Sequence, residues 1–268
     1  MPWKIASSVL IGFCAIYLGA LALLWWKQRS FIYPVPPVSD AASCVDRGSH
    51  LVRLTTEDGY HLHAIFRPAR SGLPTIVFFH GNGDTLAGSQ QATRVLAAQG
   101  YGLLLPEYRG YGGNEGVPSE TGLYRDGRAT LLWLVSQGIR AEQTVVIGNS
   151  LGSGVATEIA ATNHIGALIL ISGFTSMPDV VRAHLPFVPA HWLVLDRYEN
   201  LRKMSHVRAP VLILHGSEDT LITTKHAVSL AHARPGASVQ LMPGFGHELA
   251  YTDASQEQIA IWLRRALY

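Results

Sequence analysis

Apolar and polar positions follow two different periods along this chain, and each period predicts its own kind of element. Short apolar runs, such as Thr75 to His80 and Thr144 to Gly148, have the length and β-branched content of strands buried on both faces. Longer segments such as Leu151 to Thr162 have a helical pattern. Strands that alternate with helices predict an α/β fold, in which helices cover both faces of a mostly parallel sheet.

The same alternation continues to the end of the chain. Asp58-Gly59 predicts a hairpin turn, so we expect the sheet to open with an antiparallel pair of strands. Ser119 can cap the helix expected at 119–138. The apolar face of that helix is predicted to consist of Leu123, Leu131, Leu134 and Val135. Further strands are expected at 101–108, 165–172, 209–216 and 238–244, and further helices at 86–100, 222–234 and 255–267.

The start of the chain departs from this pattern. Ile5 to Trp26 carries no charge and would extend roughly 33 Å as a helix, at ~1.5 Å per residue, which is enough to cross a bilayer. The alternatives are a cleaved signal peptide and a buried core helix. However, the run is longer than the apolar h-region of a signal peptide, which is about 7–15 residues, and no A-x-A cleavage site follows it. It also shows no polar face, which a core helix would have. We therefore predict a single-pass, uncleaved membrane anchor, whose flanking residues are Trp3, Lys4, Trp25, Trp26, Lys27 and Arg29.

The predicted domain organisation follows from these segments. Residues 1–37 are expected to form the anchor and a stiff Pro-rich spacer, Phe31 to Pro37, while 38–268 form an α/β domain. Positive charges nearly balance on the two sides of the anchor, so the side of the membrane that the domain faces stays open. Residues 175–205, rich in Pro, His and Trp, interrupt the alternation and are expected to form a cap above the sheet.

Composition and charge exclude several function classes. The net charge is +2, and the Lys and Arg residues are scattered, so we expect no nucleic-acid partner. Cys14 lies in the apolar segment and Cys44 outside it, so we expect no disulfide between them. No histidine stands in a metal-ligand motif, and we predict neither a metal nor a cofactor. The sequence does not indicate the oligomeric state.

The stretch Gly148-Asn149-Ser150-Leu151-Gly152 joins a predicted strand to a predicted helix. A phosphate-binding loop would need a lysine here, and a dinucleotide fingerprint would need a further glycine or alanine where Thr157 stands. The remaining interpretation is a nucleophile elbow, G-x-S-x-G, which presents the Ser150 hydroxyl above the sheet. A serine hydroxyl is a weak nucleophile on its own, so this interpretation requires a base and an acid.

Both groups follow in the order that this architecture requires. Asp219 comes after the strand at 209–216, and His247 comes after the strand at 238–244. Glu218 is the alternative acid. Singly, Asp219 can also be explained as a helix cap, and His247 as a loop residue bonded to backbone. Three strand ends in this order nevertheless predict a catalytic triad of Ser150, Asp219 and His247.

A triad also needs N–H groups that stabilise the oxyanion. The N–H of Leu151, directly after the nucleophile, is one candidate, and the N–H of Asn82, in the loop after the strand at 75–80, is the other. His80 in the same loop is expected to be structural. Arg109 can be interpreted as a ligand of an anionic substrate, but a role in holding its own loop is favoured.

Taken together, these motifs resemble the α/β-hydrolase superfamily, and within it the membrane-anchored α/β-hydrolase-domain proteins. The resemblance covers nearly the whole chain and implies a serine hydrolase that cleaves esters or thioesters, with lipid-type acyl esters as substrates. One departure is Gly113-Asn114, where relatives commonly carry a Lys-Ser pair, and we expect it to bear on substrate preference. The matching stretches are Phe79 to Gly83, Tyr108 to Gly112, Glu115 to Glu120, Gly148 to Gly152, His215 to Asp219 and Gly246-His247.

Two questions stay open at this level. The alternative function is a catalytically silent, membrane-anchored scaffold of the same fold, while a dehalogenase would need an aspartate in place of Ser150. The apolar residues of the predicted cap either contact an acyl chain or bury the cap against the sheet. These residues are Leu185, Phe187, Val188, Trp192 and Leu193.

Overall fold

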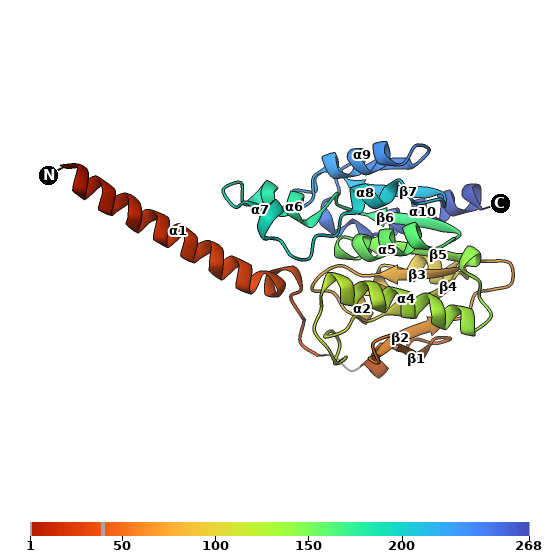
Figure 1. The fold of residues 1–268 in the computed structure, drawn as a ribbon. Helices are drawn as coiled ribbons and strands as arrows, with labels where there is room; N and C mark the ends of the chain where they lie inside the picture. Colours follow the sequence, from red (N-terminus) through yellow and green to blue (C-terminus); the bar gives the residue numbers. More distant parts are fainter. Residues whose placement is uncertain (1, 39–40, 268) are drawn as a thin grey trace.

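The computed structural model describes residues 2–38 and 41–267. A long N-terminal helix projects from a domain in which eight strands form one sheet with helices on both of its faces (Figure 1). The predicted α/β fold is therefore confirmed. The helices are α1 Pro2–Ile32, α2 Leu86–Gln91, α3 Arg94–Ala98, α4 Glu120–Ser136, α5 Leu151–Thr162, α6 Met177–His184, α7 Ala190–Leu193, α8 Asn200–Met204, α9 Thr224–Ala233 and α10 Asp253–Ala266, with short 3-10 turns η1 Ala41–Cys44, η2 Ala141–Gln143 and η3 His247–Tyr251.

The sheet has the strand order β1-β2-β4-β3-β5-β6-β7-β8. As the Asp58-Gly59 turn predicts, β1 and β2 pair antiparallel, and β2 also pairs antiparallel with β4. All later pairings are parallel. The strands are β1 His50–Thr55, β2 His61–Arg67, β3 Thr75–Phe79, β4 Gly102–Pro106, β5 Thr144–Asn149, β6 Ala167–Ile171, β7 Val211–Gly216 and β8 Ser238–Met242.

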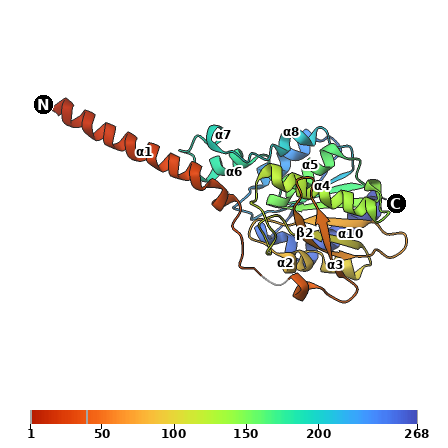
Figure 2. The same cartoon turned by 60° about the horizontal axis from the view of Figure 1, so that its bottom comes forward.

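Two hydrophobic layers hold the helices to the sheet, because successive strand residues point to opposite faces. In β3, Val77 and Phe79 pack in one layer with α4, α5, α8 and α9, whereas Ile76 and Phe78 pack in the other with α2, α3 and α10. Figure 2 shows α4, α5 and α8 on one side of the sheet and α2, α3 and α10 on the other. The central strands are thus covered on both faces, as their continuous apolar runs predict.

The helix predicted at 86–100 is interrupted, and α2 and α3 take its place. The Thr93 hydroxyl donates to the Ser89 carbonyl oxygen at 2.8 Å. The side-chain amide of Gln256, from α10, then donates to the Gln91 carbonyl at 2.9 Å and accepts from the Val95 N–H at 2.8 Å. These two backbone groups would bond to each other in a continuous helix. The prediction of one helix was wrong because a distant side chain replaces that bond.

Helix α4 confirms its predicted cap and most of its predicted apolar face. The Ser119 hydroxyl accepts a hydrogen bond from the Gly122 N–H at 3.1 Å. Leu123, Leu131 and Leu134 are buried, but Val135 is exposed. At ~100° per residue, position 135 lies about 120° around the helix from Leu123, so it falls beyond the buried face.

The N-terminal helix differs from the expectation at its C-terminal end. Within the described residues, one helix is long and apolar enough to cross a membrane, over Ala6–Ile32. The side chains of Lys4 and Ile5 lie outside the described part. Phe31 and Ile32 belong to the helix, and Ile32 and Tyr33 are buried in the core. This part of the expected spacer is therefore packed against the domain and held by apolar contacts.

Candidate active site

The direction in which the chain adds strands to the sheet reverses after β4. From β3 the chain moves outward to β4 and later returns to β5, on the other side of β3. The loops after these two adjacent strands therefore border a crevice at the carboxyl end of the sheet, where ligands bind in open α/β folds. Residues 80–83 follow β3, and Ser150 follows β5.

Ser150 occupies a strained turn between β5 and α5. Its backbone angles are φ 50° and ψ −116°, which cost a non-glycine residue about 1–3 kcal/mol. The Ser150 N–H donates to the Ile171 carbonyl at 2.9 Å and so pins the turn to β6. A Cβ at Gly148 would overlap the carbonyl of Gly152, and one at Gly152 would overlap the carbonyl of Phe79. The two glycines are therefore required for this close approach.

The structure brings Ser150, His247 and Asp219 together from three strand ends. His247 Nε2 lies 3.0 Å from Ser150 Oγ, and His247 Nδ1 lies 2.8 Å from Asp219 Oδ2. A carboxylate oxygen only accepts hydrogen bonds, so Nδ1 carries the proton and Nε2 of the neutral ring faces the hydroxyl as an acceptor. The His247 side chain is 28% exposed, which leaves it open to a substrate. This arrangement can withdraw the Ser150 proton.

Asp219 contacts His247 and does not cap the next helix, α9, which begins at Thr224 with Thr223 as its N-cap. Its Oδ1 accepts hydrogen bonds from the N–H groups of Leu221, at 3.0 Å, and Ile222, at 2.8 Å. Burial acts to raise the pKa of the Asp219 carboxyl, but the hydrogen bonds from His247 and the Ile222 N–H outweigh burial and lower the pKa. The group is thus an anion at neutral pH. Glu218 is exposed, and Asp219 is the residue that contacts His247.

A second histidine, His215, lies beside the Asp219 carboxylate. The sequence alone did not assign it a role. His215, fully buried in β7, donates from Nε2 to the Ile222 carbonyl at 2.6 Å and lies 3.5 Å from Asp219 Oδ2. Burial lowers the pKa of His215 and keeps its ring neutral. His215 therefore braces the 219–222 turn without taking the hydrogen bond that Asp219 shares with His247. Its position directly before the Gly216 strand end was the available signal.

The loop after β3 contains Asn82 and packs against Ser150. A Cβ at Gly81 would lie 3.5 Å from Ser150 Cβ, so the backbone passes close to the hydroxyl. Asn82 itself is exposed at this edge. Leu151 is the first residue of α5, and an N–H in that position has no acceptor within its own helix. Both predicted oxyanion donors thus come from segments that border Ser150.

A buried ion pair fixes the shape of this loop. His80 Nδ1 lies 2.8 Å from the Gly81 carbonyl, and His80 Nε2 lies 2.9 Å from Glu107 Oε1. Both neighbours are acceptors, so the ring binds two protons. Burial acts to lower the pKa of His80, but the hydrogen bond and charge of Glu107 prevail and raise it. Sequence reasoning expected a structural His80 but missed Glu107, which follows the end of β4 in an otherwise apolar stretch.

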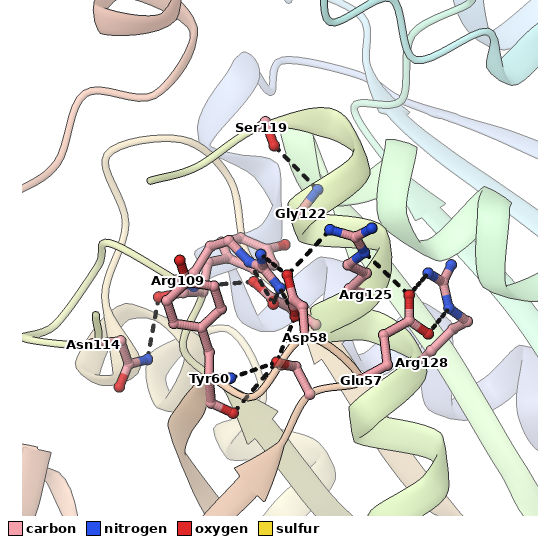
Figure 3. Close-up of polar contacts among 12 residues, drawn as sticks. Glu57, Asp58, Tyr60, Arg109, Asn114, Ser119, Gly122, Arg125 and Arg128 are labelled. Atoms are coloured by element: carbon pink, nitrogen blue, oxygen red, sulfur yellow. Dashed lines mark hydrogen bonds and ion pairs between the residues drawn. The ribbon is translucent and has the colours of Figure 1, made fainter. Parts of the chain in front are cut away.

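Arg109 holds its own loop, as favoured from the sequence. It is buried and donates to both oxygens of Asp58, at 2.8 and 3.1 Å (Figure 3). It also donates to Asp126 at 2.8 Å. The hydrogen bond from Arg109 holds the pKa of Asp58 well below its usual range. The guanidinium also lies over the Tyr60 ring, 4.9 Å from its centroid. Its donors are engaged by these carboxylates, so Arg109 is not placed as a substrate ligand.

Asn114 also has a structural position. Its amide nitrogen donates to the carbonyls of Glu107, at 3.0 Å, and Tyr108, at 3.1 Å, and its oxygen accepts from the His63 N–H at 3.0 Å. Asn114 is buried and saturated by backbone groups. The polar atoms of the Asn114 side chain bond to backbone groups and are not available to a substrate. Any effect of the Gly113-Asn114 pair on substrate preference would therefore be indirect.

Three of the five apolar residues named for the predicted cap are exposed, whereas Val188 and Leu193 are half-buried. Phe187 is 85% and Trp192 is 89% exposed, and Leu185 is exposed as well. The three exposed side chains do not bury the segment against the sheet, whereas Tyr198 and Met204 of the same segment pack in the core. Among the described residues, no group of three or more His, Cys, Asp or Glu side chains is arranged to hold a metal ion.

Sequence comparison relates this chain to one family of known proteins. A family profile described as alpha/beta hydrolase fold matches residues 74–192. An uncharacterized protein of Mycobacterium tuberculosis is 37% identical over 239 residues, which cover 85% of this chain and 83% of that protein. The lysophosphatidylserine lipase ABHD12 of Danio rerio is 31% identical over 214 residues, which cover 68% of this chain and 56% of that protein.

Solved structures share the fold at lower identity. An esterase of Pyrococcus furiosus superposes with a TM-score of 0.69 at 17% identity, over 87% of this chain and 97% of that one. At this identity the likeness shows the fold.

Proposed function

Because this chain belongs to the α/β-hydrolase fold family, we propose that it is a serine hydrolase that cleaves carboxylic ester or thioester bonds through an acyl-enzyme. The observation that carries the proposal is the hydrogen-bonded series from Ser150 Oγ through His247 to Asp219, with distances of 3.0 and 2.8 Å. Such a series activates a hydroxyl that is otherwise a weak nucleophile. A silent scaffold would not need these contacts.

The proposed reaction proceeds in two steps. His247 Nε2 takes the Ser150 proton while Oγ bonds to the acyl carbon, and the N–H groups of Leu151 and Asn82 bind the oxyanion. Collapse breaks the bond to the leaving alcohol or thiol, which receives the proton from His247. Water, deprotonated by His247, then adds to the acyl carbon and releases Ser150 and the carboxylic acid. Asp219 stabilises the imidazolium in both steps.

We propose lipid-type acyl esters as the substrate class and α1 as a membrane anchor. The relative named for lysophosphatidylserine supports a lipid substrate, although this chain spans 56% of that protein. The contacts of the last turns of α1 support a helix that is not cleaved off. Arg29 lies 2.9 Å from Asp196, and Tyr33, the residue after the helix, is buried in the core. Intact mass of the protein from isolated membranes tests the anchor, and loss of the first residues would identify a signal peptide.

A fluorophosphonate probe tests the catalytic assignment. The wild type should be labelled and Ser150→Ala should not, because the probe bonds to an activated serine oxygen. Ser153→Ala is the matched control, since Ser153 is also buried and lies three positions further along. Equal labelling of the wild type and Ser150→Ala would refute the assignment.

A further inference from the structure

A groove separates the C-terminal half of α1 from residues 175–205, here called the cap segment. Its volume is about 320 Å³, within the usual range of about 300–1,000 Å³ for small-molecule sites. Of the ten described residues that line it, nine are apolar and the tenth is Gln28. Leu24 forms part of the α1 wall, and Val181 and Leu193 form part of the opposite wall. We call this space the α1–cap groove.

The single polar residue in the groove is already bonded. Gln28 Nε2 donates to the Trp25 carbonyl at 2.8 Å and to the Leu193 carbonyl at 3.3 Å. Gln28 Oε1 accepts from the Leu195 N–H at 2.8 Å. The amide thus ties the two walls together and leaves the groove an apolar interior. Its occupant must therefore be apolar.

Three further contacts hold the cap segment along α1. The Tyr17 hydroxyl donates to the Phe187 carbonyl at 2.6 Å, Arg29 pairs with Asp196 at 2.9 Å, and the Tyr33 and Tyr198 hydroxyls lie 2.9 Å apart. In both views α6 and α7 lie beside the C-terminal half of α1 (Figures 1 and 2). The groove is therefore held open between fixed walls.

The contact at Tyr17 gives the depth of the cap segment relative to a bilayer. The apolar run of α1 ends at Trp26, and Lys27 is the first charge after it. Tyr17 precedes Lys27 by about 15 Å along the helix, at ~1.5 Å per residue. Phe187, which contacts Tyr17, would therefore lie well inside the apolar layer. The stretch 185–190 carries no charge, and Phe187 and Trp192 are exposed, as lipid contact requires.

The chain continues from the groove to the loop that borders Ser150. Ile32 lines the groove, and Pro34, two positions on, lies against the loop after β3. A Cβ at Gly83 would be 3.7 Å from the Pro34 ring, and Gly83 directly follows Asn82. Ile32 thus places one wall of the groove two residues from the segment that packs beside a proposed oxyanion donor.

We propose that the α1–cap groove binds the acyl chain of a bilayer lipid, which enters sideways from the membrane and presents its ester to Ser150. The anchor is then one wall of the substrate site, and the substrate is a long-chain acyl lipid. This inference rests on the proposed hydrolase function and adds the source and the path of the substrate. It assigns the charge-free tip of the cap segment, 185–190, to the membrane interior.

Groove-filling variants test the path in full-length protein reconstituted in phosphatidylcholine nanodiscs. Leu24→Trp and Val181→Trp fill the groove from opposite walls. In each, the ratio of kcat/KM for a palmitate ester to that for a butyrate ester should fall about tenfold or more, because the long chain loses its contacts. Leu132→Trp, on the exposed face of α4, is the control and should leave the ratio unchanged. Fluorophosphonate labelling of each variant shows that its fold is retained.

The outcomes separate the two proposals. If the wild type hydrolyses neither ester and resists the probe, the proposed hydrolase function fails. If it hydrolyses both esters and neither tryptophan variant alters the ratio, the groove is not the acyl site. A second measurement attaches an environment-sensitive fluorophore to Phe187→Cys in a background of Cys14→Ser and Cys44→Ala, with Leu132→Cys as the control.

In nanodiscs with acyl-chain spin labels, the Phe187 fluorophore should be quenched and the Leu132 fluorophore should not. Equal quenching at the two positions would overturn the depth assignment. A blue shift of the Phe187 fluorophore that grows with protein concentration in detergent, without lipid, would show that a second copy covers the tip of the cap segment, and this outcome would also overturn the depth assignment.

Discussion

The hydroxyl oxygens of Tyr33 and Tyr198 lie 2.9 Å apart in the core, although 165 positions separate the two residues. Tyr33 directly follows α1, and Tyr198 belongs to the cap segment, so this hydrogen bond joins the end of α1 to the domain. Both phenols are buried, and removal of either leaves its partner without this bond.

We expect Tyr33→Phe to lower the free energy of unfolding by about 1–3 kcal/mol, because the buried Tyr198 hydroxyl would lose its hydrogen-bond partner. Thermal unfolding in detergent, followed by intrinsic fluorescence, measures the loss. Tyr33→Phe with Tyr198→Phe should cost less than the sum of the single changes, since the second change removes the orphaned group. Strict additivity would mean that the two hydroxyls do not interact.

Asp219→Asn should reduce kcat for a short-chain ester by about 10³–10⁴-fold. The amide can still accept hydrogen bonds from Leu221 and Ile222 through its oxygen, so the turn is retained. However, it no longer favours the tautomer in which His247 Nε2 accepts the Ser150 proton. Glu218→Gln is the matched control and should keep wild-type kinetics. A similar loss in both variants would point to damage of the turn instead.

Gln256→Leu should destabilise the domain by about 1–3 kcal/mol, because the Gln91 carbonyl and the Val95 N–H would lose their partner at the break between α2 and α3. Hydrogen exchange should rise locally at 91–95. Gln137→Leu, at the exposed end of α4, serves as the comparison and should change stability by less than about 0.5 kcal/mol. No difference between the two variants would contradict the bridging role.

The His80–Glu107 pair should make stability depend on pH. The pKa of His80 is raised in the folded state, so the pair stabilises the fold fully below the unfolded pKa of about 6.5. That stabilisation is lost as the pH rises through the folded-state pKa. The difference in Tm between the wild type and His80→Gln should therefore be greatest in mild acid and should narrow in alkali. A difference that widens with rising pH would show that His80 is neutral in the folded protein.

The site is largely predictable because its signals are local. A short apolar run before Ser150 and a helical pattern after it define the turn, and Gly148 and Gly152 show where two backbones must approach. Asp219 and His247 each follow a strand, and parallel strands end at the same edge of a sheet. Their proximity follows from topology without knowledge of any side-chain contact.

The features that could not be predicted depend on single side chains that meet across long separations. The Gln256 amide reaches Val95 over 161 positions, and nothing in the 86–100 pattern indicates that a helical bond is replaced there. Glu107 stands singly, so neither period nor spacing reveals its pairing with His80. Likewise, the proline-rich composition of 31–37 indicates stiffness but not that Tyr33 is buried.

The docked end of α1 has a consequence for how substrate would be encountered. A flexible tether would let the domain swing and sample the aqueous space around its attachment point. The contacts at Arg29 and Tyr33 instead hold the domain in one orientation relative to α1. If α1 spans the bilayer, encounter becomes a two-dimensional search, in which substrate supply is set by its mole fraction in the leaflet and not by its molarity in solution.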